Sequence, residues 1–316
     1  MRNDNIYYNV RIQTPTNDTR VELNETRVVP ILDKPNEYEL AVERFFIPTT
    51  NIPIMIFKDD YYFVSFSYNG TTITKSLKWI PNTTGQDLYG NSIWNYQEFL
   101  DILNQAFLEC FTDLKTAEPG WSATNPPFMS FDPETQLFFH NFPVIYSVNM
   151  DILFSVSLYQ LFNSFVYIYQ TNSFNKEYKL KIADYGNNEI TINGNQYLST
   201  YGEWITLSTW NDLQSIVFET NSIPINPEFE QGQINKTQKI ITDFEPIQNI
   251  NDRTAFQYFP QGPLRYYDLY NDKPLYTINI SVLWKDKNNN LYPFYINKNE
   301  LLTIKLLFKK KERYLE

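Results

Sequence analysis

The sequence contains one histidine and one cysteine, and this limits the metal and nucleophile chemistry that it can support. A single histidine, His140, excludes multi-histidine metal sites and leaves one candidate base for a histidine-dependent triad. It lies between aromatic residues in the predicted strand 138–142, which favours a structural role. Cys110 falls on the apolar face of a predicted helix, where we expect a buried and unreactive thiol.

Carboxylates lie close together at Asp59 and Asp60, and again at Asp132 and Glu134. Paired carboxylates are the catalytic groups of glycoside hydrolases, but both pairs fall in predicted turns, where such residues usually form the turn itself. The run that starts at Asp286 resembles the beginning of a calcium loop, yet it lacks the glycine and the terminal glutamate of such loops. A glycine-rich phosphate loop and a CxxC pair are both missing. We therefore predict no catalytic, cofactor-binding or metal-binding residue, and a protein that is not an enzyme.

The formal net charge is −10, with 26 basic and 36 acidic side chains. Proteins that bind nucleic acid need Lys and Arg to neutralise phosphates, so this balance argues against nucleic acid as a main partner. Lys309, Lys310 and Lys311 form a basic run near the end of the chain. The run is either a solvated chain end or a weak contact with nucleic acid or an acidic neighbour, and three lysines do not decide between these readings.

The composition favours a β-rich protein without disulfides. Aromatic residues make up 17% of the chain, and aromatic side chains fit the pleated surface of a sheet. One cysteine excludes an intrachain disulfide. The first residues lack the apolar core of a signal peptide, and the most apolar region, 144–169, is broken by Asn149, Asp151 and Asn163. We expect no membrane span and a soluble protein that is made inside the cell.

Two segments near the C-terminus, 276–285 and 301–310, alternate apolar and polar residues with a period of two. This pattern predicts strands with one buried face, and a third short strand is expected at 291–296. Residues 14–26 are expected to form an arm or loop. Further strands are predicted at 6–13, 28–32, 38–47, 178–182, 189–192, 197–201, 204–208, 215–220, 239–244 and 255–259.

Turn residues predict two hairpins in the first half of the chain. Asn-Gly at 69–70 is a strong hairpin signal between strands 61–68 and 71–80. We predict a second hairpin at 128–141, because Pro133 stands in the second position of a turn, which proline favours.

One long helix is predicted after Asn95, which can cap its N-terminus while Glu98 completes a capping box. An apolar stripe continues at helical spacing as far as Leu114. A shorter helix is expected at 157–165. Many short strands punctuated by turns, with one strong helix inserted, predict a mainly β fold: an antiparallel β-sandwich or jelly roll with a small α+β insertion.

The order of several segments resembles one protein family. The C-terminal segments are Pro263-Leu264-Arg265-Tyr266-Tyr267-Asp268-Leu269, Pro274-Leu275, the strand that ends at Trp284, Lys285-Asp286, and the closing strand 302–309. Earlier segments are 38–48, which ends at a proline, the capped helix 94–111, and Pro126-Pro127-Phe128-Met129, which runs into Asp132-Pro133-Glu134-Thr135. In this order the sequence resembles the penton proteins of virophages and polinton-like viruses, which are the minor capsid proteins at the fivefold vertices.

The resemblance implies a fold, an assembly and a location. It implies a single jelly roll, with its first strands in 1–85, an α+β insertion at 86–175 and its remaining strands in 176–316. The last two strands would lie in opposite sheets, with 286–299 crossing one end of the sandwich. The protein would form homopentamers that contact the major capsid protein in the virion capsid, after assembly inside the host cell.

Two other functions remain open from the sequence. One is a virion attachment or lectin-like β-sandwich that binds host glycans through surface Tyr and Trp, and the insertion could bind a host receptor. The other is a carbohydrate-active enzyme, which the scattered carboxylates alone suggest.

Overall fold

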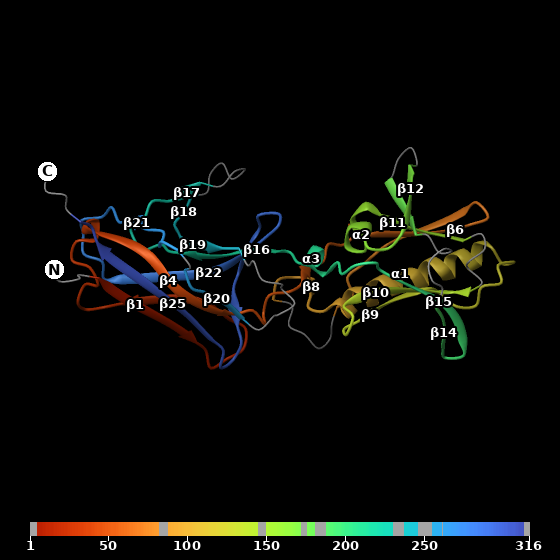
Figure 1. Ribbon diagram of the computed structural model, residues 1–316, viewed down its shortest axis with the longest axis horizontal. Coiled ribbons are helices and arrows are strands. Elements are labelled where there is room, and N and C mark those ends of the chain that lie inside the picture. The colour runs from red at the N-terminus through yellow and green to blue at the C-terminus, as the bar shows by residue number, and fades with distance from the viewer. Residues whose placement is uncertain are drawn as a thin grey trace. The chain divides into compact units, whose positions relative to one another are not determined.

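The computed structural model describes residues 5–81, 88–144, 150–171, 176–180, 188–229, 237–245, 255–260 and 262–312. The chain forms two compact units (Figure 1). Unit 1 comprises Met1–Ile52 and Asp212–Glu316, and unit 2 comprises Pro53–Asn211. Unit 2 is therefore inserted between two segments that fold together as unit 1.

Unit 1 contains two antiparallel sheets. In the first, the strand order is β1 (Ile6–Gln13), β25 (Leu301–Lys310), β4 (Tyr38–Pro48) and β20 (Ala255–Tyr258), and β21 (Tyr267–Asp268) also pairs with β4. In the second, the order is β19 (Ile240–Phe244), β16 (Leu213–Glu219), β22 (Thr277–Asp286) and β23 (Leu291–Pro293), and β3 (Glu22–Thr26) also pairs with β22. Short pairs join β2 (Thr19–Arg20) to β24 (Tyr295–Ile296), and β17 (Glu228–Phe229) to β18 (Thr237–Gln238).

The two sheets of unit 1 pack face to face through aromatic side chains. Phe45 of β4 lies 5.0 Å from Phe218 of β16 and 5.2 Å from Phe244 of β19, measured between ring centroids. Alternate residues of β22 are buried along its whole length, as the period of two predicted. The last two long strands, β22 and β25, lie in different sheets, as the resemblance implied. The prediction of an antiparallel jelly-roll sandwich with an α+β insertion is confirmed.

Unit 2 combines one long helix with two antiparallel sheets and short elements. The helix α1 spans Tyr96–Ala117. One sheet has the order β12 (Tyr167–Thr171), β13 (Lys176–Leu180), β11 (Met150–Ser155), β6 (Phe63–Tyr68) and β7 (Thr71–Ser76), and the other β14 (Asn188–Ile192), β15 (Asn195–Tyr201), β10 (Leu137–Pro143) and β9 (Phe128–Asp132). The short elements are β5 (Met55–Ile56) with β8 (Ser92–Ile93), α2 (Val156–Leu161) and α3 (Leu207–Trp210); unit 1 has one 3-10 turn, Pro35–Glu37.

The helix α1 begins where the sequence predicted. Asn95 Oδ1 accepts a hydrogen bond from the Glu98 N–H at 3.0 Å, and the Glu98 carboxylate accepts one from the Trp94 N–H at 2.7 Å. Phe107 of α1 contacts Phe66 of one sheet and His140 of the other, with ring centroids 5.5 and 5.6 Å apart. The apolar stripe of α1 therefore joins both sheets of unit 2 in one core.

Three predicted elements differ from the structure. The segment 14–26, expected to be an arm or loop, contains β2 and β3. Every residue of β3 is at least partly exposed, so its sequence lacks the apolar alternation that a buried face would produce. Residues 28–32 form no strand, and Pro30 has no N–H to donate to a ladder. Residues 204–208 run into the short helix α3, because the buried Trp210 stacks on Phe138.

The two compact units divide the chain at other residues than the predicted limits of the jelly roll and its insertion, 1–85, 86–175 and 176–316. Residues 53–85 and 176–211, which the resemblance assigned to the jelly roll, lie in unit 2. The assignment of the individual strands to a jelly-roll part and an insertion remains a prediction.

We predict that a chain truncated before Leu301 does not fold. The strand β25 pairs with β1 on one side and β4 on the other, and it buries Leu302, Ile304 and Phe308, so its loss opens the sheet and exposes its core. Near-ultraviolet circular dichroism and limited proteolysis check this result, with a chain that ends at Lys310 as the folded control. A soluble, protease-resistant unit 1 in the truncated chain would contradict the architecture.

Candidate functional site

The structure buries the histidine and the cysteine in the core of unit 2. His140 is fully buried against Phe107 and Phe142, and neither of its ring nitrogens has a hydrogen-bond partner among the residues that the structure describes. Burial lowers the pKa of His140 to about 3, so the ring is neutral. Burial also raises the pKa of Cys110 to about 12, which keeps the thiol protonated. Neither residue has the geometry of a nucleophile or a base.

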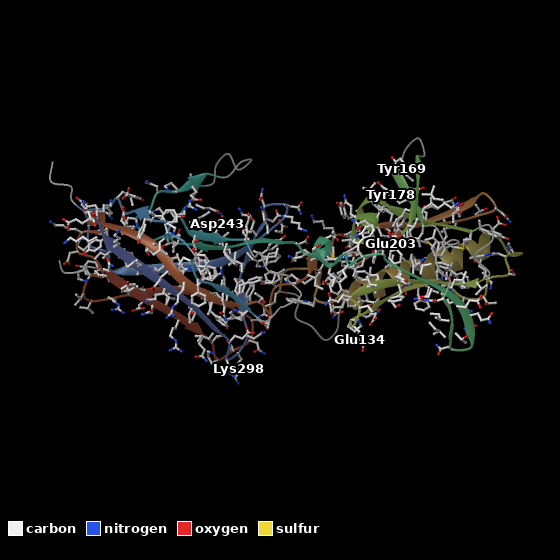
Figure 2. The ribbon with its side chains drawn as sticks, viewed as in Figure 1. Glu134, Tyr169, Tyr178, Glu203, Asp243 and Lys298 are labelled. Atoms are coloured by element: carbon white, nitrogen blue, oxygen red, sulfur yellow. The ribbon has the colours of Figure 1, made fainter. Side chains whose placement is uncertain are left out.

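The carboxylate pairs form turns, as predicted. Asp59 Oδ1 accepts a hydrogen bond from the Trp79 N–H at 2.7 Å, and Asp60 adopts a left-handed backbone with φ 56°. Asp132 accepts hydrogen bonds from the Glu134 N–H at 3.0 Å and from the Thr135 hydroxyl at 2.7 Å. The bond from Thr135 lowers the pKa of Asp132, and Glu134 itself points outward at the turn (Figure 2).

Asp286 holds a turn of the backbone together. Its carboxylate is buried and accepts hydrogen bonds from the Asn288 and Asn290 N–H groups at 2.8 Å each, and from the Asn290 side chain at 2.9 Å. These donors satisfy the carboxylate without a cation. Among the residues that the structure describes, no group of three or more His, Cys, Asp or Glu side chains could hold a metal ion.

Two lysines of the C-terminal basic run contact side chains of their own unit. Lys309 lies over the ring of Tyr266, with Nζ 5.1 Å from the centroid, and Lys311 forms an ion pair with Asp268 at 2.6 Å. These contacts favour a structural role for the run. No helix within the described residues is long and apolar enough to cross a membrane.

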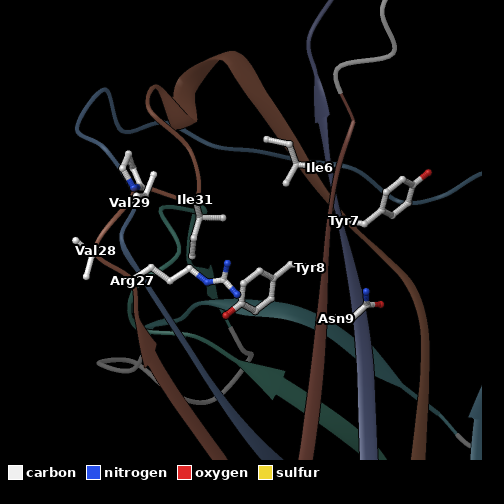
Figure 3. Close-up of a pocket in the computed structure, with 9 residues that line it drawn as sticks. Ile6, Tyr7, Tyr8, Asn9, Arg27, Val28, Val29 and Ile31 are labelled. Carbon is white, nitrogen blue, oxygen red and sulfur yellow. The ribbon is translucent and has the colours of Figure 1, made fainter.

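A groove of about 690 Å³ lies beside the first strand of unit 1 (Figure 3). It is lined on one side by β1 residues Ile6 to Asn9, and on the other by residues 27–31, which we call the strap. The lining is mixed, with five apolar side chains, Ile6, Val28, Val29, Pro30 and Ile31, beside four polar ones. The polar side-chain atoms come from Tyr7, Tyr8, Asn9 and Arg27, so the groove is suited to binding a surface that presents both apolar and polar groups.

Two of the polar lining residues, Tyr8 and Arg27, are bonded to Glu25. The Tyr8 hydroxyl donates to Glu25 at 2.6 Å, and the Arg27 Nε donates to the same carboxylate at 3.1 Å. Figure 3 shows the Arg27 side chain beside the Tyr8 ring, and the guanidinium lies 5.3 Å from the ring centroid. Burial, with the hydrogen bond to Glu25, raises the pKa of Tyr8 to about 12, and the same bond lowers the pKa of Glu25. Tyr8, Arg27 and Glu25 therefore form one hydrogen-bonded cluster, in which the Glu25 carboxylate accepts from both of the other side chains.

The strap presents two valines to solvent on a fixed backbone. The Arg27 N–H donates to the Tyr276 carbonyl at 3.0 Å, and the Ile31 N–H donates to the Leu275 carbonyl at 2.7 Å. Between these anchors Val28 is 97% exposed and Val29 is 72% exposed. Sequence reasoning assigned 28–32 to an edge strand and missed this surface; Pro30 was the signal that could have corrected it.

Unit 1 is a jelly roll, an architecture that occurs among viral capsid proteins and lectins, and unit 2 is inserted in its chain. The family model of the Sputnik minor capsid protein V18/19 matches residues 6–310. The chain belongs to this family, and it is therefore a structural component of a virion capsid.

Two proteins of the Sputnik virophage are similar in sequence. Structural protein V19 is 30% identical over 124 residues, which cover 37% of this chain and 57% of V19. The uncharacterized protein V18 is 27% identical over 141 residues, which cover 35% of this chain and 84% of V18. The match thus spans less than two thirds of the length of V19.

Two solved structures have the same fold. A chain of the Sputnik virophage, determined by cryo-EM, has a TM-score of 0.80 at 24% identity, with 98% of each chain covered. The mavirus penton protein, determined by crystallography, has a TM-score of 0.76 at 17% identity, with 98% of this chain and 100% of that protein covered. Both likenesses cover unit 1 and unit 2.

The buried His140 predicts that acid destabilises unit 2. Its pKa is about 3 in the folded chain against about 6.5 when unfolded, so the unfolded state binds the extra proton as pH falls. The contribution of the neutral His140 to the free energy of unfolding is complete above pH 6.5, and it is lost progressively between pH 6.5 and pH 3. At pH 5 the loss is about 2 kcal/mol relative to pH 7.

Denaturant unfolding followed by tryptophan fluorescence measures this effect, because five of the six tryptophans lie in unit 2. The matched control is His140→Phe, which keeps an aromatic ring but cannot be protonated. The wild type should lose about 2 kcal/mol more than the variant between pH 7 and pH 5. Equal losses in the two proteins would show that His140 is not responsible.

Proposed function

We propose that this chain is a penton protein, which forms a homopentamer at the fivefold vertices of an icosahedral capsid and contacts the major capsid protein there. The observation that carries the proposal is the match of a minor capsid protein family over residues 6–310, on a chain whose fold is that of the mavirus penton protein. Cyclic assemblies need surfaces that bury apolar groups between copies. The exposed Val28 and Val29 beside the groove are groups of this kind.

The proposal predicts that the purified chain sediments as a pentamer. Analytical ultracentrifugation should give a species of about five times the chain mass of 37.6 kDa at high protein concentration. An increase in salt should leave this species largely intact, because apolar contacts are screened less than surface ion pairs. A strictly monomeric chain at the highest soluble concentration would count against the pentamer.

A cluster of tyrosines in unit 2 supports a second candidate function, attachment to host glycans or to a host receptor. The rings of Tyr159 and Tyr178 are stacked, with centroids 3.8 Å apart, and Tyr169 lies 5.4 Å from Tyr178 (Figure 2). Tyr169 and its neighbour Ile168 are both about half exposed. Exposed tyrosine supplies a rigid apolar ring together with a hydroxyl group, and it is common on recognition surfaces for this reason.

A glycan array tests the attachment function. Specific binding that is lost in Tyr169→Ala, and kept in Tyr201→Ala, would support it. Tyr201 is a suitable control because it is similarly exposed but lies on β15, in the other sheet of unit 2. Binding that does not change in Tyr169→Ala would remove the tyrosine cluster as the contact.

A further inference from the structure

The jelly roll of unit 1 has two lateral sides, each made of the edges of both sheets. On the first, which we call the β1 side, the edge strand β1 lies next to β3 and the strap, and the hydrogen bond between Tyr8 and Glu25 joins them. On the second, the β20 side, β20 lies next to β19, and Phe244 contacts Phe256 and Tyr258. The strands β25 and β4 separate β1 from β20, so the two sides face in different directions.

The β1 side has the features of a surface that another chain covers. The strand β1 has eight residues, and within the described part of the chain it pairs with β25 alone. A long open edge of this kind invites pairing with a further chain unless it is protected. Beside it lie the groove, and Val28 and Val29, which the anchored strap holds in solvent. Because the backbone of the strap is fixed at both ends, covering it costs little conformational entropy.

The β20 side presents exposed aromatic side chains, which suit contact with the exposed valines of the β1 side. Phe259, directly after β20, is 58% exposed, and Tyr266, directly before β21, is 38% exposed. Both β20 and β21 pair with β4 on the side opposite β25, so these aromatics lie along one edge of the sheet. An aromatic side chain is a common anchor in the core of an interface, and the groove is large enough to hold one.

We propose that the β1 side of one copy binds the β20 side of the next copy, with Phe259 of the second copy packed against the strap and groove of the first. This contact is heterologous, since two different surfaces of the same chain meet, and such contacts generate closed rings when the rotation between copies divides the circle. The proposal rests on the proposed pentamer and assigns its interface. A second copy suits this surface because the chain itself carries both complementary sides.

Sedimentation of three variants tests the assignment. The double variant Val28→Asp/Val29→Asp places acidic groups on the β1 side, and Phe259→Asp places one on the β20 side. Burying a charge without a partner is costly, so each variant alone should sediment as a monomer of 37.6 kDa. The control is Val156→Asp, an exposed valine at the first position of α2 in unit 2, where an acidic residue suits the helix N-terminus. It should assemble like the wild type. All variants should keep the wild-type circular dichroism spectrum at 25 °C, because the altered side chains are exposed within the chain. The thermal midpoint of the two dissociated variants should fall, since loss of assembly removes the stability that it contributes.

A mixture of the two interface variants distinguishes a heterologous contact from a symmetric one. The strap variant keeps an intact β20 side, and the Phe259→Asp variant keeps an intact β1 side, so one good interface can form between them. The mixture should give a complex of two chains that cannot close into a ring. Failure to form this complex, or strap-to-strap dimers of Phe259→Asp, would overturn the heterologous assignment.

The outcomes separate this inference from the proposed function. If the wild type and the interface variants all form pentamers, the pentamer stands and the assigned surfaces are wrong. If only the strap variant dissociates, the partner surface is not the β20 side and the proposal is overturned. If the wild type is monomeric, the pentamer itself fails, and the assignment fails with it.

Discussion

The position of β25 between β1 and β4 is the constraint on which unit 1 depends. It brings Ile6 opposite Phe308, so residues from the two ends of the chain complete one sheet. The facing sheet closes over it through Phe45, which contacts Phe218 and Phe244. Because both segments of unit 1 supply strands to both sheets, unit 1 cannot be completed until the C-terminal segment is present. The 159 residues from Pro53 to Asn211 form a separate core without interrupting either sheet.

The sequence predicted the elements whose own residues carry a pattern. The alternation in β22 and β25, the Asn-Gly turn after Tyr68 and the capping box at Asn95 all have local physical causes, and the structure contains each of them. The strand β3 was missed because it has no buried face and is held by its pairing with β22. The limits of the two units were also out of reach, since they depend on contacts between residues far apart in the sequence.

The groove shows a similar limit for functional surfaces. Its lining comes from β1 and the strap, which a tertiary hydrogen bond between Tyr8 and Glu25 holds together, and the residue types alone predict no such neighbourhood. By contrast, the inert character of His140 and Cys110 was predicted from their apolar surroundings, and both are fully buried. In this chain the side chains that could do chemistry lie in the core or hold turns, and the interface that we propose is made of exposed apolar and aromatic side chains.

We propose that unit 1 is a capsid jelly roll whose two lateral sides meet between copies around a fivefold axis. A cryo-EM reconstruction of capsids that contain this chain tests it most directly. We expect density for five copies at each vertex, with the strap of one copy against Phe259 of its neighbour. Density for the chain away from the fivefold axes, or a strap that faces solvent in the assembled vertex, would contradict it.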